Sequence, residues 1–457
     1  MEAHVRLRSI SIVVAGLAVA TGWLPACAAR QPVEPTPVAL AAASLPTLAS
    51  TVTLGPTERA APAATPTQFP SLPVDLPLGP IAYRVPLTIR HVTTDRVTLY
   101  LELSQPSPGK VWVQPEDRSE PALGLELSPN EGRWLTTIEG LAPGTTYHVA
   151  VALEPEGQPA TQPQFRSTAW GPVSFRTASE GEPLRIGLIS DASFGDPATF
   201  DLVRQMAGAQ LDFVLHAGDV VDETESGQDA ARSFADKFYA PFEPLLTRMP
   251  VYTVPGNHDY DADIRAGESP FYYLAFPPFP DDASPGQEAA GRNQFYAFGR
   301  DDLQFVMLDT QTLYGVPGRE EQEAWLQERL SDPRFGATII VMHVAPFSSS
   351  SVHPGDSLAP RQRWVPLFEA ARVPLVLSGH FHGFERLISN GLTYLVAGGG
   401  SAILYDSLEP LPQSQAIHRR THFVLLEVED QAIQATAYAL GGEVLDQATI
   451  PLPPKAE

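Results

Sequence analysis

The region from residue 83 to 178 contains short stretches in which apolar and polar residues alternate. Alternation with a period of two places one face of a strand against a core and the other face toward water. Stretches of this kind at this spacing predict a small all-β sandwich. The predicted strands are Val85–Val92, Arg96–Leu103, Lys110–Val113, Arg133–Ile138, Tyr147–Ala152 and Val173–Thr177.

A different pattern begins at Leu184, where apolar runs alternate with helical stretches. This alternation is typical of an α/β layer fold. Asp196-Pro197 predicts the start of a helix, because Asp can cap the helix and Pro suits its first turn. An amphipathic helix is predicted at Glu320–Leu330. The last apolar segments, His422–Val428 and Ile433–Ala439, predict antiparallel strands that close the sheet.

Residues 1–26 have the features of a secretory signal peptide. Arg6 and Arg8 precede an apolar run, residues 10–20, that is shorter than the roughly 20 residues of a membrane span. The box that follows, Leu24-Pro-Ala-Cys27, resembles a bacterial lipobox. This resemblance implies that Cys27 is lipidated and that the protein is an extracytoplasmic lipoprotein of the cell envelope. The alternative is an ordinary signal peptide cut at a nearby Ala, which would leave a secreted protein.

The composition narrows the other possibilities. Residues 27–82, rich in Pro, Ala and Thr, predict a flexible tether. A formal net charge of −23 repels a nucleic-acid backbone, so we expect no nucleic-acid partner. Cys27 is the only cysteine, which excludes an intramolecular disulfide, so packing and metals must provide the stability.

Five apolar runs of the α/β region end at a residue that can bind a metal ion. Ligands of open α/β sheets bind beyond the carboxyl ends of the strands, so these ends can converge on one site. Glycine before three of the candidates permits a tight turn and a close backbone approach. One strand-end histidine alone is more often a core or surface residue, but five ends in order, separated by helix-sized segments, indicate a metal site. The candidates are Asp191, Asp219, Asn257-His258-Asp259, His343 and His380-Phe381-His382.

The order of these motifs resembles the calcineurin-like metallophosphoesterase family over residues 184–452. Within that family, Gly379–Arg386 and Met342–Ser349 are similar to the signature and the ligand loop of purple acid phosphatases. Leu141–Tyr147 resembles the turn before the penultimate strand of fibronectin type III domains, with Tyr147 as the corner tyrosine. Similar domains precede the catalytic domain of purple acid phosphatases. The resemblance implies an α/β fold, a four-layer β-sandwich flanked by helices, behind a fibronectin III-like sandwich at 83–178.

The resemblance also implies a centre of two metal ions. Carboxylate, amide and imidazole ligands suit Fe, Mn or Zn. Two such ions would hold a bridging hydroxide, bind the phosphoryl oxygens and stabilise an in-line displacement. In these roles Asp219 would bridge the ions, Asp191 and His382 would complete the first site, and Asn257, His343 and His380 would complete the second.

Three further residues have catalytic roles by the same resemblance. His258 would contact the phosphate or protonate the leaving group. Asp259 would orient His258, although a capping role is equally compatible with its position. His353, ten residues after His343, matches a substrate-facing histidine of purple acid phosphatases, and the alternative is a plain loop residue.

Two positions depart from the family pattern. Purple acid phosphatases have a metal-binding tyrosine three residues after the bridging aspartate, where this chain has Asp222. The wider family has a histidine two residues after the first aspartate, where this chain has Ser193. The first metal site therefore lacks one expected ligand, and Asp222 either replaces it or only braces the loop.

The residues and the resemblance together predict a phosphomonoesterase, similar to acid phosphatases, that acts on a small phosphate ester. A phosphodiesterase on the same metal site is the alternative among enzymes, because the leaving-group pocket is not encoded in the metal motifs. A surface binding protein with a degraded site is the alternative outside enzymes, and Ser193 and Asp222 are its only support.

Overall fold

The computed structural model describes eleven stretches of the chain: residues 49–51, 83–103, 107–117, 123–127, 133–153, 173–179, 181–222, 233–260, 288–290, 295–429 and 431–454. The chain divides into two compact units, Met1–Thr47 and Leu48–Glu457. The predicted signal peptide, Cys27 and nearly all of the tether lie outside the described residues, so these segments and the domain boundaries stay predictions. In the described stretches, no helix is long and apolar enough to cross a membrane.

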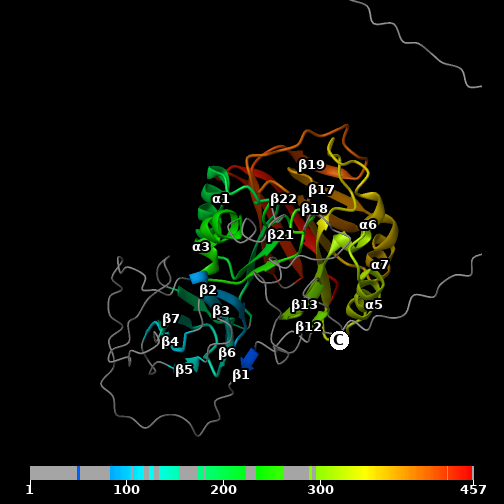
Figure 1. The fold of residues 1–457 in the computed structure, drawn as a ribbon. Helices are drawn as coiled ribbons and strands as arrows, with labels where there is room; N and C mark the ends of the chain where they lie inside the picture. Colours follow the sequence, from blue (N-terminus) through cyan, green and yellow to red (C-terminus); the bar gives the residue numbers. More distant parts are fainter. Residues whose placement is uncertain are drawn as a thin grey trace, which may run out of the picture. The chain divides into compact units, whose positions relative to one another are not determined.

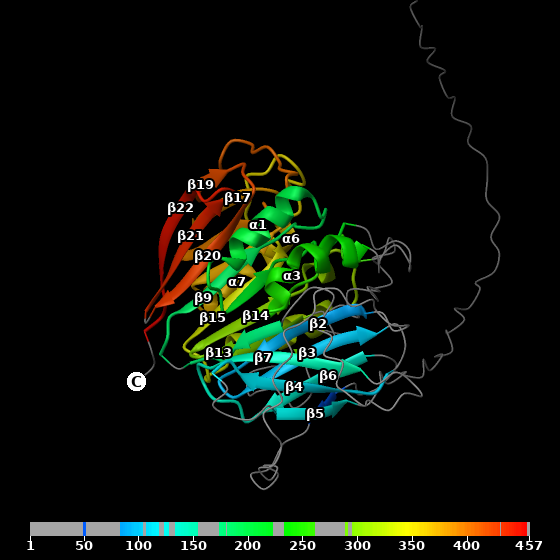
Figure 2. The ribbon, with the colours of Figure 1, turned by 90° about the vertical axis from the view of Figure 1, so that its left-hand side faces the viewer.

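A β-sandwich opens the second unit (Figure 2). Its two sheets, ordered β1-β6-β3-β2 and β5-β4-β7-β8, enclose one apolar core. The hydroxyl of buried Tyr147 accepts a hydrogen bond from the Ala142 N–H at 2.8 Å, the contact expected of a corner tyrosine. The six predicted strands are confirmed as β2, β3, β4, β6, β7 and β8. Strands β1 and β5 were not predicted, and β1 lies in the segment predicted as a tether. The bounds are β1 (Ala49–Thr51), β2 (Tyr83–Val92), β3 (Arg96–Leu103), β4 (Gly109–Pro115), β5 (Leu123–Leu127), β6 (Arg133–Glu139), β7 (Thr146–Leu153) and β8 (Val173–Arg176).

Two larger sheets form the α/β region. The six-stranded sheet has the order β11-β10-β9-β20-β21-β22, and the eight-stranded sheet has the order β12-β13-β14-β15-β16-β18-β17-β19. Both contribute to one core, so they pack face to face. Central strands are buried on both faces, as expected for strands covered on two sides. The bounds are β9 (Leu184–Ile189), β10 (Phe213–His216), β11 (Val251–Thr253), β12 (Glu288–Ala290), β13 (Phe295–Arg300), β14 (Leu303–Leu308), β15 (Ala337–Val344), β16 (Leu375–Gly379), β17 (Phe384–Ser389), β18 (Leu392–Ala397), β19 (Ser414–His418), β20 (His422–Glu429), β21 (Ala432–Ala439) and β22 (Val444–Pro451).

Helices cover the outer faces of both sheets (Figure 1). Those that follow β9 and β10 pack on the six-stranded sheet, and those that follow β14 and β15 pack on the eight-stranded sheet. The predicted four-layer α/β fold is therefore confirmed. The helices are α1 (Pro197–Ala207), the π-helix η1 (Phe234–Tyr239), α3 (Ala240–Leu246), the 3-10 helix η3 (Thr310–Leu313), α5 (Arg319–Leu330), α6 (Leu358–Arg363) and α7 (Val365–Ala370).

The two predicted helix patterns hold in the structure. Helix α1 begins at Pro197, and the Asp196 carboxylate accepts a hydrogen bond from the Thr199 N–H at 2.8 Å. Helix α5 covers the predicted amphipathic segment and buries Gln322 and Leu326. The last apolar segments form the antiparallel pair β20 and β21, as predicted. They do not close the sheet, because β22 pairs with β21 and forms its edge.

Direct contacts join the β-sandwich to the α/β region. His91 of β2 forms a hydrogen bond with the Tyr252 hydroxyl of β11, with Nδ1 and the oxygen 2.5 Å apart. The Ser174 N–H donates to the Thr247 carbonyl at 3.0 Å. Val85 of the sandwich is also buried in the core that contains α1 and α3. The sandwich therefore supports the strand β11, which leads into Asn257.

Candidate metal centre

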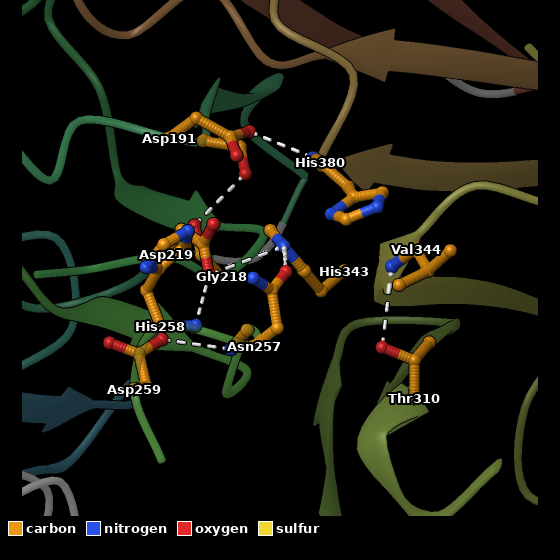
Figure 3. A network of polar contacts seen from close by, with 12 residues as sticks. Asp191, Gly218, Asp219, Asn257, His258, Asp259, Thr310, His343, Val344 and His380 are labelled. Atoms are coloured by element: carbon orange, nitrogen blue, oxygen red, sulfur yellow. Dashed lines mark hydrogen bonds and ion pairs between the residues drawn. The ribbon is translucent and has the colours of Figure 1, made fainter. Parts of the chain in front are cut away.

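Strand ends bring the six predicted ligands together, and Figure 3 labels all of them except His382. Strands β9, β10 and β11 are parallel, so the residues that follow them lie at one edge of their sheet. Strands β15 and β16 of the other sheet are also parallel, and they end at the same place. His343 lies within β15, one residue before its end. Each of the other predicted ligands lies one to four residues beyond the end of its strand. The residues brought together are Asp191, Asp219, Asn257, His343, His380 and His382.

The predicted second metal site, together with the bridging Asp219, contains three residues whose ligand atoms lie close together. Asp219, His343 and His380 each offer a ligand atom within 4.8 Å of the others, and all three residues are buried. His343 Nε2 lies 3.1 Å from Asn257 Oδ1 and 3.3 Å from Asp219 Oδ1. One cation can therefore contact an imidazole, an amide oxygen and a carboxylate at this position.

The predicted first site is formed by Asp191 and His382. Asp191 Oδ2 accepts a hydrogen bond from the His380 N–H at 2.9 Å, and His382 Nε2 lies 3.4 Å from Asp191 Oδ1. That Oδ1 atom is buried and accepts no hydrogen bond from any described residue. A buried carboxylate oxygen without a donor is costly unless a cation binds it. This oxygen and the donor set therefore fit the metal ion that the family resemblance implies.

The backbone at the ligands is strained. Asp191, Asp219 and His380 have positive φ angles of 57°, 51° and 69°. This conformation is rare for residues with a Cβ and costs about 1–3 kcal/mol at each position. Three such residues in one site indicate that the fold holds these side chains in place for a function.

The glycines before the ligands are required for space, as predicted. A Cβ on Gly256 would lie 2.1 Å from Asp219 Oδ1, and a Cβ on Gly379 would lie 1.9 Å from Ser190 Oγ. At Gly218 the φ angle is 93°, and a Cβ would lie 2.5 Å from the His343 ring. The close backbone approach inferred from the sequence is therefore present at all three turns.

The site attracts positive charge. Burial raises the pKa of Asp219, but the His343 and His258 imidazoles outweigh burial and hold it well below its usual range. Burial lowers the pKa of His343, yet the Asp219 and Asp191 carboxylates outweigh burial and raise it to about 9. A protonated imidazole therefore neutralises these carboxylates when no metal does. Metal binding must displace that proton, so metal affinity falls as the pH falls.

Of the three predicted catalytic residues, two lie at the solvent-exposed edge of the site, called its rim here, and one is buried. His258 is exposed, and its N–H donates to Asp219 Oδ1 at 3.0 Å. The half-exposed His353 ring lies 5.4 Å from the His380 ring, centroid to centroid. Asp259 is fully buried, and its carboxylate accepts hydrogen bonds from the N–H groups of Gly256, Val220 and Val221 at 2.8–3.2 Å. These bonds support the capping role of Asp259, while the catalytic roles of all three stay predictions.

Asp222, the candidate for the missing ligand of the first site, contacts a lysine in the structure. Its carboxylate forms an ion pair with Lys237 of η1, and both side chains are largely buried. Ser193, at the position where the wider family has a histidine, is buried. The contact with Lys237 favours the bracing role of Asp222 over metal binding.

Two residues that sequence reasoning missed contact the ligand histidines. The Tyr405 ring stacks on the His382 ring, with centroids 4.1 Å apart and planes 7° apart. Asp356 Oδ2 lies 2.9 Å from His380 Nε2. Asp356 has one signal in the sequence, its position three residues after His353. Tyr405 has none, because it lies in an irregular loop beyond β18.

A comparison with known families identifies the α/β region. Residues 184–384 match the model of the calcineurin-like phosphoesterase family. These residues form a calcineurin-like phosphoesterase domain. The match contains the six ligand positions, so the order of motifs in the sequence and the geometry of the site agree with the family.

Curated proteins similar to this chain include purple acid phosphatases. Purple acid phosphatase 23 of Arabidopsis thaliana is 30% identical over 35% of this chain and 36% of its own length. Purple acid phosphatase 22 of the same plant is 25% identical over 53% of this chain and 54% of its own length. An uncharacterised protein of Mycobacterium tuberculosis is 25% identical over 54% of this chain and 49% of its own length. The chain thus matches about half the length of these relatives or less.

A solved structure supports the fold over a longer stretch. The purple acid phosphatase PPD1 from yellow lupin (Lupinus luteus) seeds superposes with a TM-score of 0.66 at 17% identity. The superposition covers 82% of this chain and 75% of the lupin chain. Because this coverage exceeds the phosphoesterase domain, the shared architecture extends beyond residues 184–384.

Proposed function

We propose that this protein is an extracytoplasmic dinuclear metal phosphoesterase, and that phosphate monoesters are its substrates. The observation that carries the proposal is the convergence of six ligand residues, three of them in strained backbone conformations, at the carboxyl ends of parallel strands. Bound metal ions would supply activation of water and neutralisation of charge at the phosphoryl group.

The chain's own residues define how a phosphate ester would be held. His258 is exposed beside Asp219, so its imidazole can reach a phosphoryl oxygen or the leaving-group oxygen. The half-exposed His353 lies next to His380. Two imidazoles at the rim favour a phosphate group with several free oxygens, which supports a monoester over a diester.

The location of the enzyme is a separate part of the proposal. The basic and apolar segments before Leu24-Pro-Ala-Cys27 support export and lipidation of Cys27. Residues 27–82 would then place the folded part of the protein away from the membrane surface.

Turnover of two chromogenic esters tests the chemistry. We expect metal-loaded protein to hydrolyse p-nitrophenyl phosphate with a higher kcat/KM than bis(p-nitrophenyl) phosphate. His353→Ala should reduce this preference, because it removes one of the two rim imidazoles. A higher kcat/KM for the diester would assign a phosphodiesterase, and bound metal without turnover of either ester would assign a binding protein.

A further inference from the structure

Three histidines line the proposed metal centre, and each has one ring nitrogen in contact with a group that is not itself a predicted ligand. His343 Nδ1 lies 2.8 Å from the Ala217 carbonyl, and His382 Nδ1 lies 2.9 Å from the Ile403 carbonyl. A carbonyl oxygen can only accept, so both Nδ1 atoms carry hydrogen. In the neutral, metal-binding form of each ring the lone pair is therefore on Nε2, which faces Asp219 in one case and Asp191 in the other.

His380 has the opposite arrangement. Its Nε2 lies 2.9 Å from Asp356 Oδ2, a carboxylate oxygen that accepts the hydrogen. Nδ1 is then the nitrogen with the free lone pair. One ring nitrogen of His380 lies within 4.8 Å of the ligand atoms of Asp219 and His343. Since Nε2 contacts Asp356, Nδ1 is the nitrogen left for a cation.

The loop around Asp356 holds its carboxylate against His380. The Asp356 N–H donates to the His353 carbonyl at 3.0 Å, and His353 has a φ angle of 55°, so the turn is tight. The Tyr314 hydroxyl donates to the Asp356 carbonyl from the other side. His353 Nδ1 lies 3.8 Å from the same Asp356 oxygen, which places the carboxylate between the two imidazoles.

We propose that Asp356 is a positioning residue of the second metal site, whose carboxylate orients His380 and raises the basicity of its Nδ1. The proposal rests on the proposed function, because it assumes the metal centre. Carboxylates behind metal-binding histidines fix the ring and its tautomer, and their loss typically costs about 10–100-fold in metal affinity. Backbone carbonyls contact the His343 and His382 rings, whereas the His380 ring is contacted by a side chain, that of Asp356.

Metal affinity of Asp356→Ala tests the proposal. We expect the variant to bind Mn²⁺ at the second site about 10–100-fold more weakly than wild type, with the first site little changed. Asp356→Glu should restore part of the loss, because it keeps a carboxylate in the loop. Asp406→Ala is the matched control, since Asp406 is an exposed carboxylate next to Tyr405, which stacks on His382. An equal loss of Mn²⁺ affinity in the control would overturn the proposal in favour of a general effect of negative charge.

A double-mutant cycle separates positioning from direct metal binding. If Asp356 acts only through His380, its removal in a His380→Ala background causes no further loss of Mn²⁺ affinity. A further loss of Mn²⁺ affinity in that background would make Asp356 a ligand in its own right and contradict the positioning role. If wild-type protein binds none of Mn²⁺, Zn²⁺ and Fe²⁺, the proposed function fails as well. Wild-type affinity in Asp356→Ala overturns only the inference about Asp356.

Discussion

Asn257 and His258 are neighbours in the chain but have different positions in the site. The Asn257 amide oxygen points toward His343 Nε2, whereas the His258 imidazole is exposed at the rim. We expect Asn257→Ala to lower metal affinity by more than the roughly 10–100-fold that is lost when a residue that only supports a ligand is removed. His258→Ala should keep its metal and lose about 10²–10⁴-fold in kcat, the range of general acid catalysis.

Metal content by mass spectrometry, measured together with turnover, checks this pair of variants. His148→Ala, an exposed histidine of the β-sandwich, serves as the control for the loss of an imidazole. A His258 variant that loses its metal would make His258 a ligand and would reverse the roles assigned to the two residues.

The convergence of the predicted ligand residues could be predicted from the sequence, because each one ends an apolar run. Strand ends in an α/β sheet converge, and the glycines mark the turns. Asp356 and Tyr405 could not be predicted in this way. They reach the site through irregular loops, whose path depends on tertiary contacts such as the hydrogen bond between Tyr314 and the Asp356 carbonyl.

At the scale of elements, α1 depends on one residue at its start. The Asp196 carboxylate caps the helix at Thr199, and its other oxygen accepts a hydrogen bond from the Ala402 N–H at 2.8 Å. Asp196→Ala removes both bonds, so we expect a loss of at least about 1 kcal/mol in the free energy of unfolding. Asp201→Ala, an exposed aspartate of the same helix, should change it far less.

Urea denaturation of the metal-free protein measures the two variants on α1. Metal is left out because its binding to the folded state would mask the difference. Equal stability of the Asp196 and Asp201 variants would show that the cap and the bond to Ala402 contribute nothing measurable.

Elements with a strong apolar pattern could be predicted, and weakly patterned ones could not. The apolar positions of helix α5 and of the pair β20 and β21 predict these elements. Strand β22 is an edge strand that buries only Ile450 among its eight residues, so it has no alternating pattern to detect. Strand β5 is short, and its pairing with β4 positions it more than its own sequence does.

At the scale of the molecule, His91 makes the junction between the β-sandwich and the phosphoesterase domain sensitive to acid. Burial, together with the charges of Arg300 and Arg96, lowers the pKa of His91 to about 3. The unfolded chain therefore binds one more proton than the folded chain between pH 6.5 and 3. The free energy of unfolding then falls as the pH falls through this window, by up to about 1.4 kcal/mol per pH unit for this group.

His91→Gln removes this titration. We expect the urea midpoint of the variant to fall less steeply between pH 7 and pH 4.5 than that of wild type, in metal-free protein. His148→Gln, in the same β-sandwich but exposed, should keep the wild-type slope. Wild-type steepness in the His91 variant would show that other groups cause the acid sensitivity.

Attachment to a membrane is the second prediction for the whole molecule. If Cys27 is lipidated, wild-type protein should sediment with membranes, and Cys27→Ala should be released or remain unprocessed. Western blots of fractionated cells measure the distribution. Equal solubility of wild type and variant would leave the ordinary signal peptide as the explanation of residues 1–26.

The sequence could predict the layers of the fold but not the surroundings of the substrate. The layers follow from local patterns, whereas the rim of the site combines loops from distant parts of the chain, such as those of His258, His353 and Tyr405. The order of the metal motifs therefore predicts the class of reaction more firmly than it predicts the ester.

A metal titration of turnover tests the central claim most directly. Metal-stripped full-length protein is titrated in parallel with Mn²⁺, Zn²⁺ and Fe²⁺, and hydrolysis of p-nitrophenyl phosphate is followed at each addition. We expect no turnover without metal. With at least one of these metals, turnover should rise to a plateau at about two ions per chain. Binding of two ions without any hydrolysis, or turnover that persists in the stripped protein, would contradict the central claim.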